Sequence, residues 1–297
     1  MEILDTIGGT PLISLSKISA GSGAALFAKA EFMNPSGSVK DRAAKAMLLD
    51  GIKSGRLTPD KIIVDATSGN TGIAYAMLGA AAGFRVRLYM PGNASFERKR
   101  LIRSYGAEIA ETDPMEGSDG AFRAVREAVA AKPEAFFYPD QYNNPVNPLT
   151  HYQTTGREIW EQTGGRVTHF ITGTGTSGTF MGVSRRLKEE NPEIKVFAVQ
   201  PDSPFHGIEG TKHMASTIKP GVWDEGRADG FIEISTEEAY DTARRLARVE
   251  GVFVGVSSGG NAAAALKLAK TVPAGSVIVT VLCDGGSRYL SDDFWGL

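Results

Sequence analysis

Cysteine is nearly absent from this sequence, because only Cys283 among 297 residues carries a thiol. A single cysteine excludes an intramolecular disulfide and a cysteine-rich metal site, and it fits a reducing, cytoplasmic setting. Histidine is also scarce, and its four copies are scattered without a pair at i, i+4 spacing. We therefore expect neither cross-links nor a zinc site.

An excess of charge of one sign is lacking too. The 34 acidic and 32 basic residues give a formal net charge of −2, so nothing indicates nucleic acid or an anionic membrane surface as a partner. The first residues carry acids where a signal peptide needs bases, and no apolar segment follows them. The longest uncharged stretch, residues 66–84, opens on polar residues, and we interpret it as a polar loop that enters a buried helix.

Glycine, by contrast, is abundant, and short apolar runs alternate with helical patterns. The 35 glycines make up about 12% of the chain, against roughly 7% on average. Strands are expected at residues 61–65, 85–90, 107–111, 135–138, 167–172, 194–199 and 276–282. Helices are expected at residues 71–83, 96–105, 118–132, 178–190, 235–250 and 259–270. This alternation predicts α/β units around mostly parallel sheets.

Three local features mark boundaries and irregular segments within this pattern. Turn-forming residues between Pro139 and Pro145 indicate a domain boundary. Residues 201–229 lack periodicity, which is typical of a functional or mobile segment. Ser235, followed three residues later by Glu238, predicts a capping box at the start of a helix.

A glycine-rich segment, Gly173-Thr174-Gly175-Thr176-Ser177-Gly178, follows an expected strand and opens an expected helix. Its glycines allow backbone N–H groups to approach a phosphate at the helix N-terminus. A dinucleotide site would place an acid near the end of the next strand, which instead ends in Val199-Gln200-Pro201. With Thr176 and Thr179 as additional hydroxyls, the segment favours a lone phosphate, and a purely structural turn is the alternative.

A second motif, Gly255-Val256-Ser257-Ser258-Gly259, matches the pattern of a hydrolase nucleophile elbow. In that fold the catalytic histidine follows the serine in the chain. All four histidines here precede Ser257, so we do not expect a hydrolase.

Two more polar segments precede expected helices. The segment Thr67-Ser68-Gly69-Asn70-Thr71-Gly72 would cap a helix, but its polar side chains exceed what one cap requires. An anion such as a carboxylate also fits there. The segment from Asn34 to Arg42 contains Lys40, whose protonated form a helix N-terminus would disfavour, although a solvated surface lysine is the alternative.

Together these segments resemble the cysteine synthase family (O-acetylserine sulfhydrylases) of fold type II pyridoxal-phosphate enzymes. The likeness runs from Gly8-Gly9-Thr10-Pro11-Leu12 to Arg288-Tyr289-Leu290-Ser291. It implies two α/β domains with mostly parallel twisted sheets flanked by helices, similar to tryptophan synthase β, and an active site in the cleft between them. The smaller domain would span residues 36–144 and carry the substrate loop. The larger would span residues 1–35 plus 145–297 and bind pyridoxal 5′-phosphate.

The resemblance also implies roles for single residues. Lys40 matches the lysine that forms the Schiff base with the cofactor, and Asn70 matches the asparagine that binds the cofactor 3′-oxygen. Ser257 matches the hydroxyl that faces the pyridine nitrogen. The phosphate would be bound by Gly175, Thr176, Ser177, Gly178 and Thr179. The amino-acid carboxylate would be bound by Thr67, Ser68, Gly69, Thr71 and Gln141.

The implied reaction is a β-replacement that forms L-cysteine. A serine cannot keep the pyridine nitrogen protonated, so the ring is a weaker electron sink, which favours elimination. An O-activated serine would lose its leaving group, and a sulfur donor would attack the resulting aminoacrylate.

Three segments resemble the B-type branch of the family: residues 90–98, residues 207–214 and Cys283-Asp284-Gly285-Gly286. Some members of that branch use O-phosphoserine in place of O-acetylserine, and some take sulfur from a thiocarboxylated carrier protein in place of sulfide. Lys212 falls near the position where the phosphoserine users carry an arginine for the substrate phosphate, and a solvated loop lysine is the alternative.

Other functions and partners stay open at this point. Cystathionine β-synthase and serine/threonine dehydratase share the scaffold, and a catalytically silent cofactor-binding protein is a different class. Besides a small amino-acid substrate and a sulfur donor, the family implies a homodimer and either a sulfur-carrier protein or serine acetyltransferase as protein partners.

Overall fold

The computed structural model describes residues 1–67 and 69–296, and the chain divides into two compact units. Unit 1 comprises Met1–Ile7 and Lys40–Val146, and unit 2 comprises Gly8–Val39 and Asn147–Leu297. The domain boundaries expected from the sequence, at residues 36 and 145, stay predictions. No helix in the described part of the chain is both long and apolar enough to cross a membrane.

Unit 1 is built on a four-stranded parallel sheet. Its strand order is β5 (Glu108–Thr112), β4 (Arg85–Pro91), β3 (Ile62–Ala66), β6 (Phe136–Phe137). Because side chains alternate along a strand, β3 contributes to two cores: Ile63 packs into one, and Val64 and Ala66 pack into the other. Helices cover both faces as a result.

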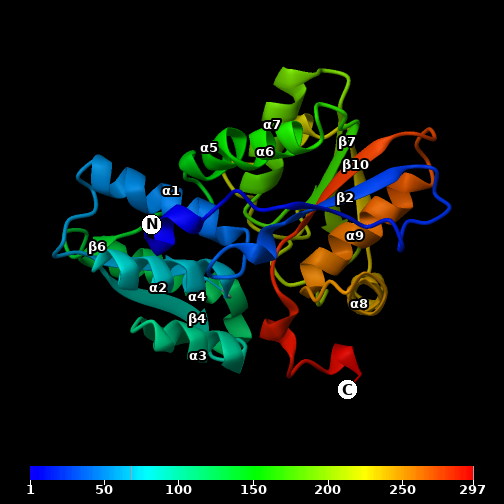
Figure 1. The fold of residues 1–297 in the computed structure, drawn as a ribbon. Helices are drawn as coiled ribbons and strands as arrows, with labels where there is room; N and C mark the ends of the chain where they lie inside the picture. Colours follow the sequence, from blue (N-terminus) through cyan, green and yellow to red (C-terminus); the bar gives the residue numbers. More distant parts are fainter. Residues whose placement is uncertain (68, 297) are drawn as a thin grey trace. The chain divides into compact units, whose positions relative to one another are not determined.

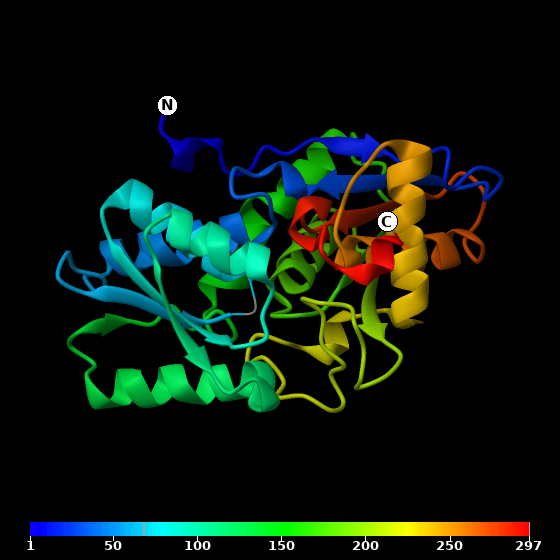
Figure 2. The ribbon, with the colours of Figure 1, turned by 90° about the horizontal axis from the view of Figure 1, so that it is seen from below.

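The helices of unit 1 follow this division. The face that includes Ile63 packs against α1 (Lys40–Lys53), α2 (Asn70–Ala82) and α3 (Phe96–Ser104), and the opposite face packs against α4 (Gly117–Ala131) (Figure 2). Every residue of α2 from Thr71 to Gly79 is buried. Buried surroundings explain why this helix is uncharged, and they confirm the interpretation of residues 66–84 as a loop that enters a buried helix.

Unit 2 is built on a six-stranded sheet. Its order is β1 (Leu12–Ser14), β2 (Ala25–Ala30), β10 (Val277–Leu282), β7 (His169–Gly173), β8 (Lys195–Pro201), β9 (Gly230–Ile234). The β1–β2 pair is antiparallel, and the other four pairs of this sheet are parallel. Figure 1 shows α6 (Thr155–Gln162) and α7 (Gly178–Glu190) on one face, and α8 (Thr236–Arg245) and α9 (Val256–Ala269) on the other. A further helix, α5 (Val146–Gln153), precedes α6. The fold class is therefore α/β with mostly parallel sheets, as predicted.

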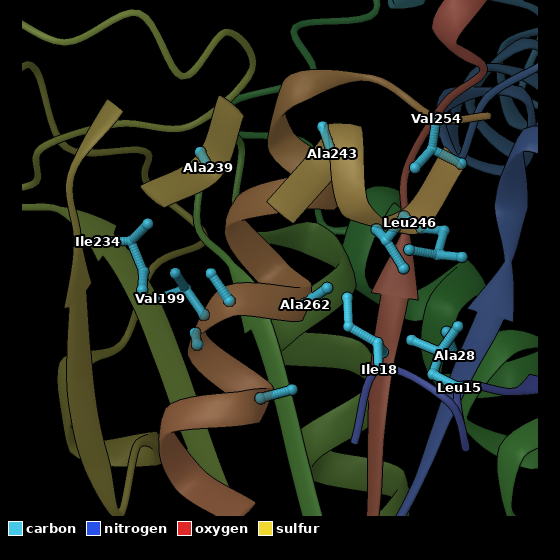
Figure 3. Packing of buried hydrophobic residues seen from close by; sticks show 14 of the residues in the cluster. Leu15, Ile18, Ala28, Val199, Ile234, Ala239, Ala243, Leu246, Val254 and Ala262 are labelled. Atoms are coloured by element: carbon cyan, nitrogen blue, oxygen red, sulfur yellow. The ribbon is translucent and has the colours of Figure 1, made fainter. Parts of the chain in front are cut away.

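Small side chains allow α8 and α9 to pack closely in the core of unit 2 (Figure 3). A Cβ at Gly259 would lie 2.1 Å from the carbonyl oxygen of Ala239, so the contact requires glycine. The predicted capping box opens α8: Glu238 N–H donates to Ser235 Oγ at 3.1 Å, and Ser235 N–H donates to Glu238 Oε2 at 3.0 Å. The helix is shorter than the predicted 235–250, because a π-helical turn replaces it over Leu246–Glu250.

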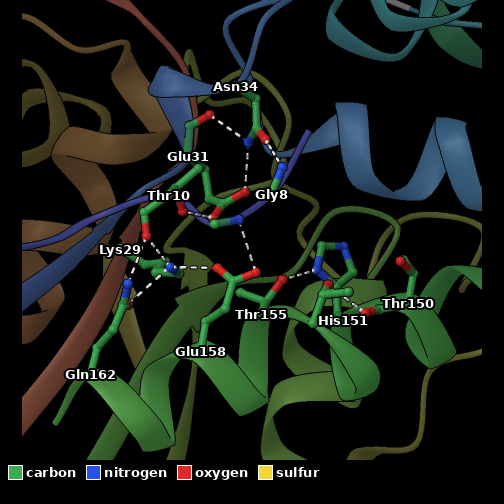
Figure 4. A network of polar contacts seen from close by, with 12 residues as sticks. Gly8, Thr10, Lys29, Glu31, Asn34, Thr150, His151, Thr155, Glu158 and Gln162 are labelled. Atoms are coloured by element: carbon green, nitrogen blue, oxygen red, sulfur yellow. Dashed lines mark hydrogen bonds and ion pairs between the residues drawn. The ribbon is translucent and has the colours of Figure 1, made fainter. Parts of the chain in front are cut away.

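A buried polar cluster fixes the N-terminal segment of unit 2 (Figure 4). Lys29 is fully buried, and its Nζ pairs with Glu158 Oε2 at 2.6 Å and donates to Gln162 Oε1 at 3.0 Å and to the Thr10 carbonyl. Glu31 accepts the Thr10 hydroxyl at 2.7 Å. These bonds join β2, α6 and the segment around Thr10, because a buried charge needs partners on several sides.

Candidate active site

Lys40 is the first residue of α1 and is half-buried. The chain just before it is anchored within unit 2. Val39 N–H donates to the Cys283 carbonyl at 2.8 Å, and Ser38 forms an antiparallel bridge with Asp284. The predicted cofactor lysine therefore follows directly on a segment that hydrogen bonds hold at the end of β10.

The substrate turn, residues 67–72, connects β3 to α2 in unit 1. Thr67 Oγ1 accepts the N–H of Gly69 at 3.1 Å and of Gly72 at 3.2 Å, so a residue two positions before the N-cap satisfies the first helical turn. Asn70 is the first residue of α2 and is half-buried. Ser68 lies outside the described residues. The turn thus combines a helix N-terminus with hydroxyl and amide groups, which suits a carboxylate.

Gln141 joins this turn from a distant part of the chain. Its Oε1 accepts the Thr71 hydroxyl at 2.9 Å, and its Nε2 donates to the Ala66 carbonyl at 3.3 Å. Both Gln141 and Thr71 are buried. The structure therefore brings together two predicted carboxylate-binding residues that are 70 positions apart.

Arg98 of α3 also lies at the substrate turn, although the sequence analysis did not single it out. Its side chain is only 3% exposed, and a Cβ at Gly69 would lie 2.4 Å from its Cδ. A larger residue at position 69 would therefore displace the Arg98 side chain. A cation beside the turn favours an anionic ligand.

The phosphate turn, residues 173–179, connects β7 to α7 in unit 2. A Cβ at Gly175 would lie 2.1 Å from the Gly210 carbonyl oxygen, and one at Gly178 would lie 1.9 Å from Asn147 Oδ1. Ser177 has a left-handed φ of 68°, and its buried Oγ has no hydrogen-bond partner within the described chain. A phosphate at this helix N-terminus would satisfy that hydroxyl.

Neighbouring side chains hold the threonine hydroxyls of the phosphate turn. Asn147 Nδ2 donates to Thr176 Oγ1 at 3.1 Å, and His151 Nε2 lies 3.3 Å from Thr179 Oγ1. Sequence reasoning missed both Asn147 and His151, because each belongs to a helix that it did not predict. The only available signal was their place in the polar segment after the expected domain boundary.

Ser257 lies in the first turn of α9, is 7% exposed, and lines a pocket of unit 2. The other residues that line the pocket are Val199, Gln200, Pro201, Ile208, Thr211, Gly260 and Asn261. Asn261 links this helix to the phosphate turn, since its Oδ1 accepts Gly173 N–H at 2.7 Å and its Nδ2 donates to the Val281 carbonyl at 2.8 Å. This buried amide was also missed, because no sequence pattern marks it.

Lys212 lies in the irregular segment and is half-buried. Its backbone N–H donates to the Thr174 carbonyl at 2.8 Å, so the residue is fixed against the phosphate turn. Its Nζ lies 3.4 Å from the Ile218 carbonyl oxygen.

The residues present fit pyridoxal 5′-phosphate. Gly175 and Gly178, which leave no room for a Cβ, and the buried Ser177 hydroxyl suit its phosphate, and the Ser257 hydroxyl is among the groups that line a pocket. Lys40 provides a primary amine for its aldehyde.

Comparison with known proteins gives a consistent result. The family described as "Pyridoxal-phosphate dependent enzyme" matches residues 3–284. A cysteine synthase of Aquifex aeolicus is 51% identical over 295 residues, which cover 97% of this chain and 90% of that protein. Cysteine synthase B of Salmonella typhimurium is 43% identical over 291 residues, which cover 98% of this chain and 95% of that protein. The crystal structure of cysteine synthase from Entamoeba histolytica aligns with a TM-score of 0.94 at 37% identity, covering 100% of this chain and 90% of that one. The chain therefore belongs to the family of pyridoxal-phosphate dependent enzymes.

Proposed function

We propose that this protein is a cysteine synthase of the B type, which replaces the β-substituent of an O-activated serine with sulfur to form L-cysteine. The observation that carries the proposal is the phosphate turn, where Gly175 and Gly178 flank the buried hydroxyl of Ser177. The 51% identity of the chain to a cysteine synthase supports it. The phosphate of the cofactor is bound there by Gly175, Thr176, Ser177, Gly178 and Thr179.

When bound, pyridoxal phosphate supplies an electron sink for the bonds at the α-carbon of the amino acid. Lys40 Nζ would hold this group covalently and, when free, would provide the base at the α-carbon. Lys40 Nζ then takes the α-proton, and the leaving group departs from the β-carbon with its bonding electron pair. After the sulfur nucleophile has added to the β-carbon, Lys40 Nζ returns the proton to the α-carbon.

The other residues orient the reactants. Thr67, Ser68, Gly69, Thr71 and Gln141 bind the substrate carboxylate, and Arg98 adds positive charge beside them. Asn70 would bind the 3′-oxygen of the cofactor, and the Ser257 hydroxyl would donate a hydrogen bond to the pyridine nitrogen without protonating it. Lys212 contacts the leaving group when that group is a phosphate.

The protein is further proposed to act in the cytoplasm as a homodimer, with a sulfur-carrier protein or serine acetyltransferase as a further partner. O-acetylserine and O-phosphoserine are the candidate substrates, and sulfide or a carrier-protein thiocarboxylate is the candidate sulfur source.

The role of Lys40 is tested by reducing the holoenzyme with borohydride and mapping the labelled peptide. We expect the label on Lys40, and none in a Lys40→Ala variant that still binds the cofactor through the phosphate turn. Lys53→Ala, at the exposed end of the same helix, is the matched control and should be labelled like the parent. A label on any other lysine in the parent contradicts the assignment.

The reaction is tested by steady-state kinetics with O-acetylserine and O-phosphoserine, each with sulfide, with homocysteine and without a nucleophile. We expect cysteine formation with sulfide to be the fastest reaction. Faster turnover with homocysteine would identify a cystathionine β-synthase, and faster release of pyruvate without a nucleophile would identify a dehydratase.

A further inference from the structure

A carboxyl group lies buried two residues before the substrate turn. Asp65 is the fourth residue of β3 and is 0% exposed. Its Oδ1 accepts the N–H of Ala66 at 2.8 Å, while its buried Oδ2 has no hydrogen-bond partner within residues 1–67 and 69–296. No ion pair involves Asp65 in this part of the chain. A charged carboxylate in such a place would be poorly compensated.

The surroundings of Asp65 are aromatic or acidic. The fully buried Tyr75 of α2 interacts with it, and the Tyr75 hydroxyl itself donates to Met47 Sδ at 3.9 Å. Tyr138 interacts with Asp65 electrostatically and has a buried hydroxyl without a partner in the described chain. The other charged or titratable groups around this cluster are Asp140 and Tyr142 after β6, and Asp119 and Arg126 of α4.

These surroundings favour the neutral form of Asp65. Burial, together with the negative charge of Asp140, raises the pKa of this carboxyl well above its ordinary value. The positive charge of Arg126 lowers the pKa of Tyr138, whereas no cation is among the groups that shift the pKa of Asp65. A proton on Oδ2 turns an oxygen that lacks a donor into a donor, for which the Tyr75 hydroxyl oxygen is an acceptor.

The bond from Ala66 connects this acid to the substrate turn. The Ala66 N–H is held by Asp65, and the Ala66 carbonyl accepts Gln141 Nε2 at 3.3 Å. Gln141 in turn accepts the hydroxyl of Thr71 at 2.9 Å. A continuous series of hydrogen bonds therefore runs from Asp65 to two residues of the proposed carboxylate site.

We propose that Asp65 is a positioning residue that acts as a neutral acid, holding Ala66 so that Gln141 and Thr71 are set to bind the substrate carboxylate. The binding of the substrate carboxylate by Gln141 and Thr71 rests on the proposed function of the turn. A neutral side chain suits this place, because a second negative charge two residues before the turn would oppose binding of an anionic group.

The protonation of Asp65 is tested by infrared difference spectroscopy of the holoenzyme at pH 8. We expect the carbonyl stretch of a protonated carboxylic acid in the parent, and its loss in Asp65→Asn. Asp60→Asn is the matched control, because Asp60 is exposed on the same unit and a hydrogen bond from Thr58 lowers its pKa. Absence of the protonated band in the parent overturns the proposal, whatever the enzyme turns over.

Unfolding gives a second readout that does not need substrate. A native state that retains a proton on Asp65 loses stability as pH rises above the ordinary Asp pKa of about 4, and Asp65→Asn lacks this loss. The midpoint of Asp65→Asn relative to the parent should therefore rise between pH 4.5 and pH 8. A constant difference overturns the neutral form.

Kinetics test the positioning role. Asn retains an acceptor for Ala66 N–H, so Asp65→Asn should keep KM for the amino-acid substrate within about twofold at pH 8. Asp65→Leu removes the acceptor and should raise KM by about tenfold, the effect of one hydrogen bond, with little change in kcat. An Asn variant that raises KM by tenfold, or a folded Leu variant that does not, overturns the positioning role. If Asp65→Leu does not fold, the Asn variant and the infrared band still decide. A parent that consumes no activated serine refutes the proposed function instead.

Discussion

A single hydroxyl, that of Ser257, distinguishes the proposed elimination chemistry from carbanion chemistry. Replacing it with a carboxylate would keep the pyridine nitrogen protonated and change where electron density accumulates. We expect Ser257→Asp to bind the cofactor but to lose most β-replacement activity, while Ser257→Ala loses less. Its place in the first turn of α9 tolerates an acid, so folding should be preserved. Cofactor absorbance and the rate of cysteine formation measure the two effects, and equal turnover in the Asp variant and the parent refutes the role.

Lys212 is a second single residue with a testable role, because we expect it to distinguish O-phosphoserine from O-acetylserine. If its amine contacts a phosphate leaving group, Lys212→Ala should lower kcat/KM for O-phosphoserine by about 10- to 100-fold, the effect of roughly 1.5–3 kcal/mol. O-acetylserine, which has no charge there, should be nearly unaffected. The backbone bond of Lys212 to Thr174 does not depend on the side chain, so the turn should be preserved. An equal effect on both substrates indicates loop closure, and no effect indicates a surface residue.

Residues could be predicted from the sequence where their chemistry is tied to a local pattern. The glycines and hydroxyls of residues 173–179 and 67–72 follow strands and open helices, so they were visible as turns. Gln141 could be named only through the family resemblance, because its contact with Thr71 spans 70 positions. Arg98 and Asn261 were missed, since a buried cation or amide is recognised by its partners in space.

At the scale of the element, the phosphate turn and α7 act as one unit. Ala at position 178 would place a Cβ 1.9 Å from Asn147 Oδ1, so Asn147 would have to turn away and release Thr176. We expect Gly178→Ala to weaken cofactor binding at least tenfold, measured by fluorescence titration of the apoprotein. Gly92→Ala is the control, because its Cβ would meet only ordinary contacts, the nearest at 3.5 Å. Unchanged affinity in Gly178→Ala would show that this part of the phosphate turn does not bind the cofactor.

Element prediction succeeded where periodicity was long and clear. The helix predicted at 178–190 is observed with these bounds, and the strands around 62–66 and 85–91 differ by one residue at their ends. The short strands β1, β2 and β9 and the helices α5 and α6 were missed, because three to eight residues are too few for a periodic pattern. The π-helical turn at Leu246–Glu250 was also missed, since its helical periodicity does not reveal a local change in hydrogen bonding.

At the scale of the whole molecule, cofactor removal should lower thermal stability. A ligand that binds only the native state adds about 2.7 kcal/mol at 100 times its Kd, which corresponds to several degrees in Tm. Calorimetry of the apoprotein and holoenzyme measures the difference. Pyridoxal, which lacks the phosphate, should restore little of it. Equal shifts with pyridoxal and pyridoxal phosphate contradict the phosphate turn as the anchor.

The fold class was predictable because strands and helices alternate along nearly the whole chain. The order of strands in each sheet was not, because pairing depends on contacts between distant segments. In unit 2, β10 lies between β2 and β7, although about 100 to 250 residues separate these strands along the chain. Local propensity contains no information on such neighbours.

The left-handed backbone of Ser177 has a consequence for the stability of the protein. A side chain other than glycine in this region costs about 1–2 kcal/mol, which the remainder of the fold must offset. Glycine at this position would relieve the strain but remove the hydroxyl. The protein thus gives up some stability to keep a hydroxyl at this position of the phosphate turn.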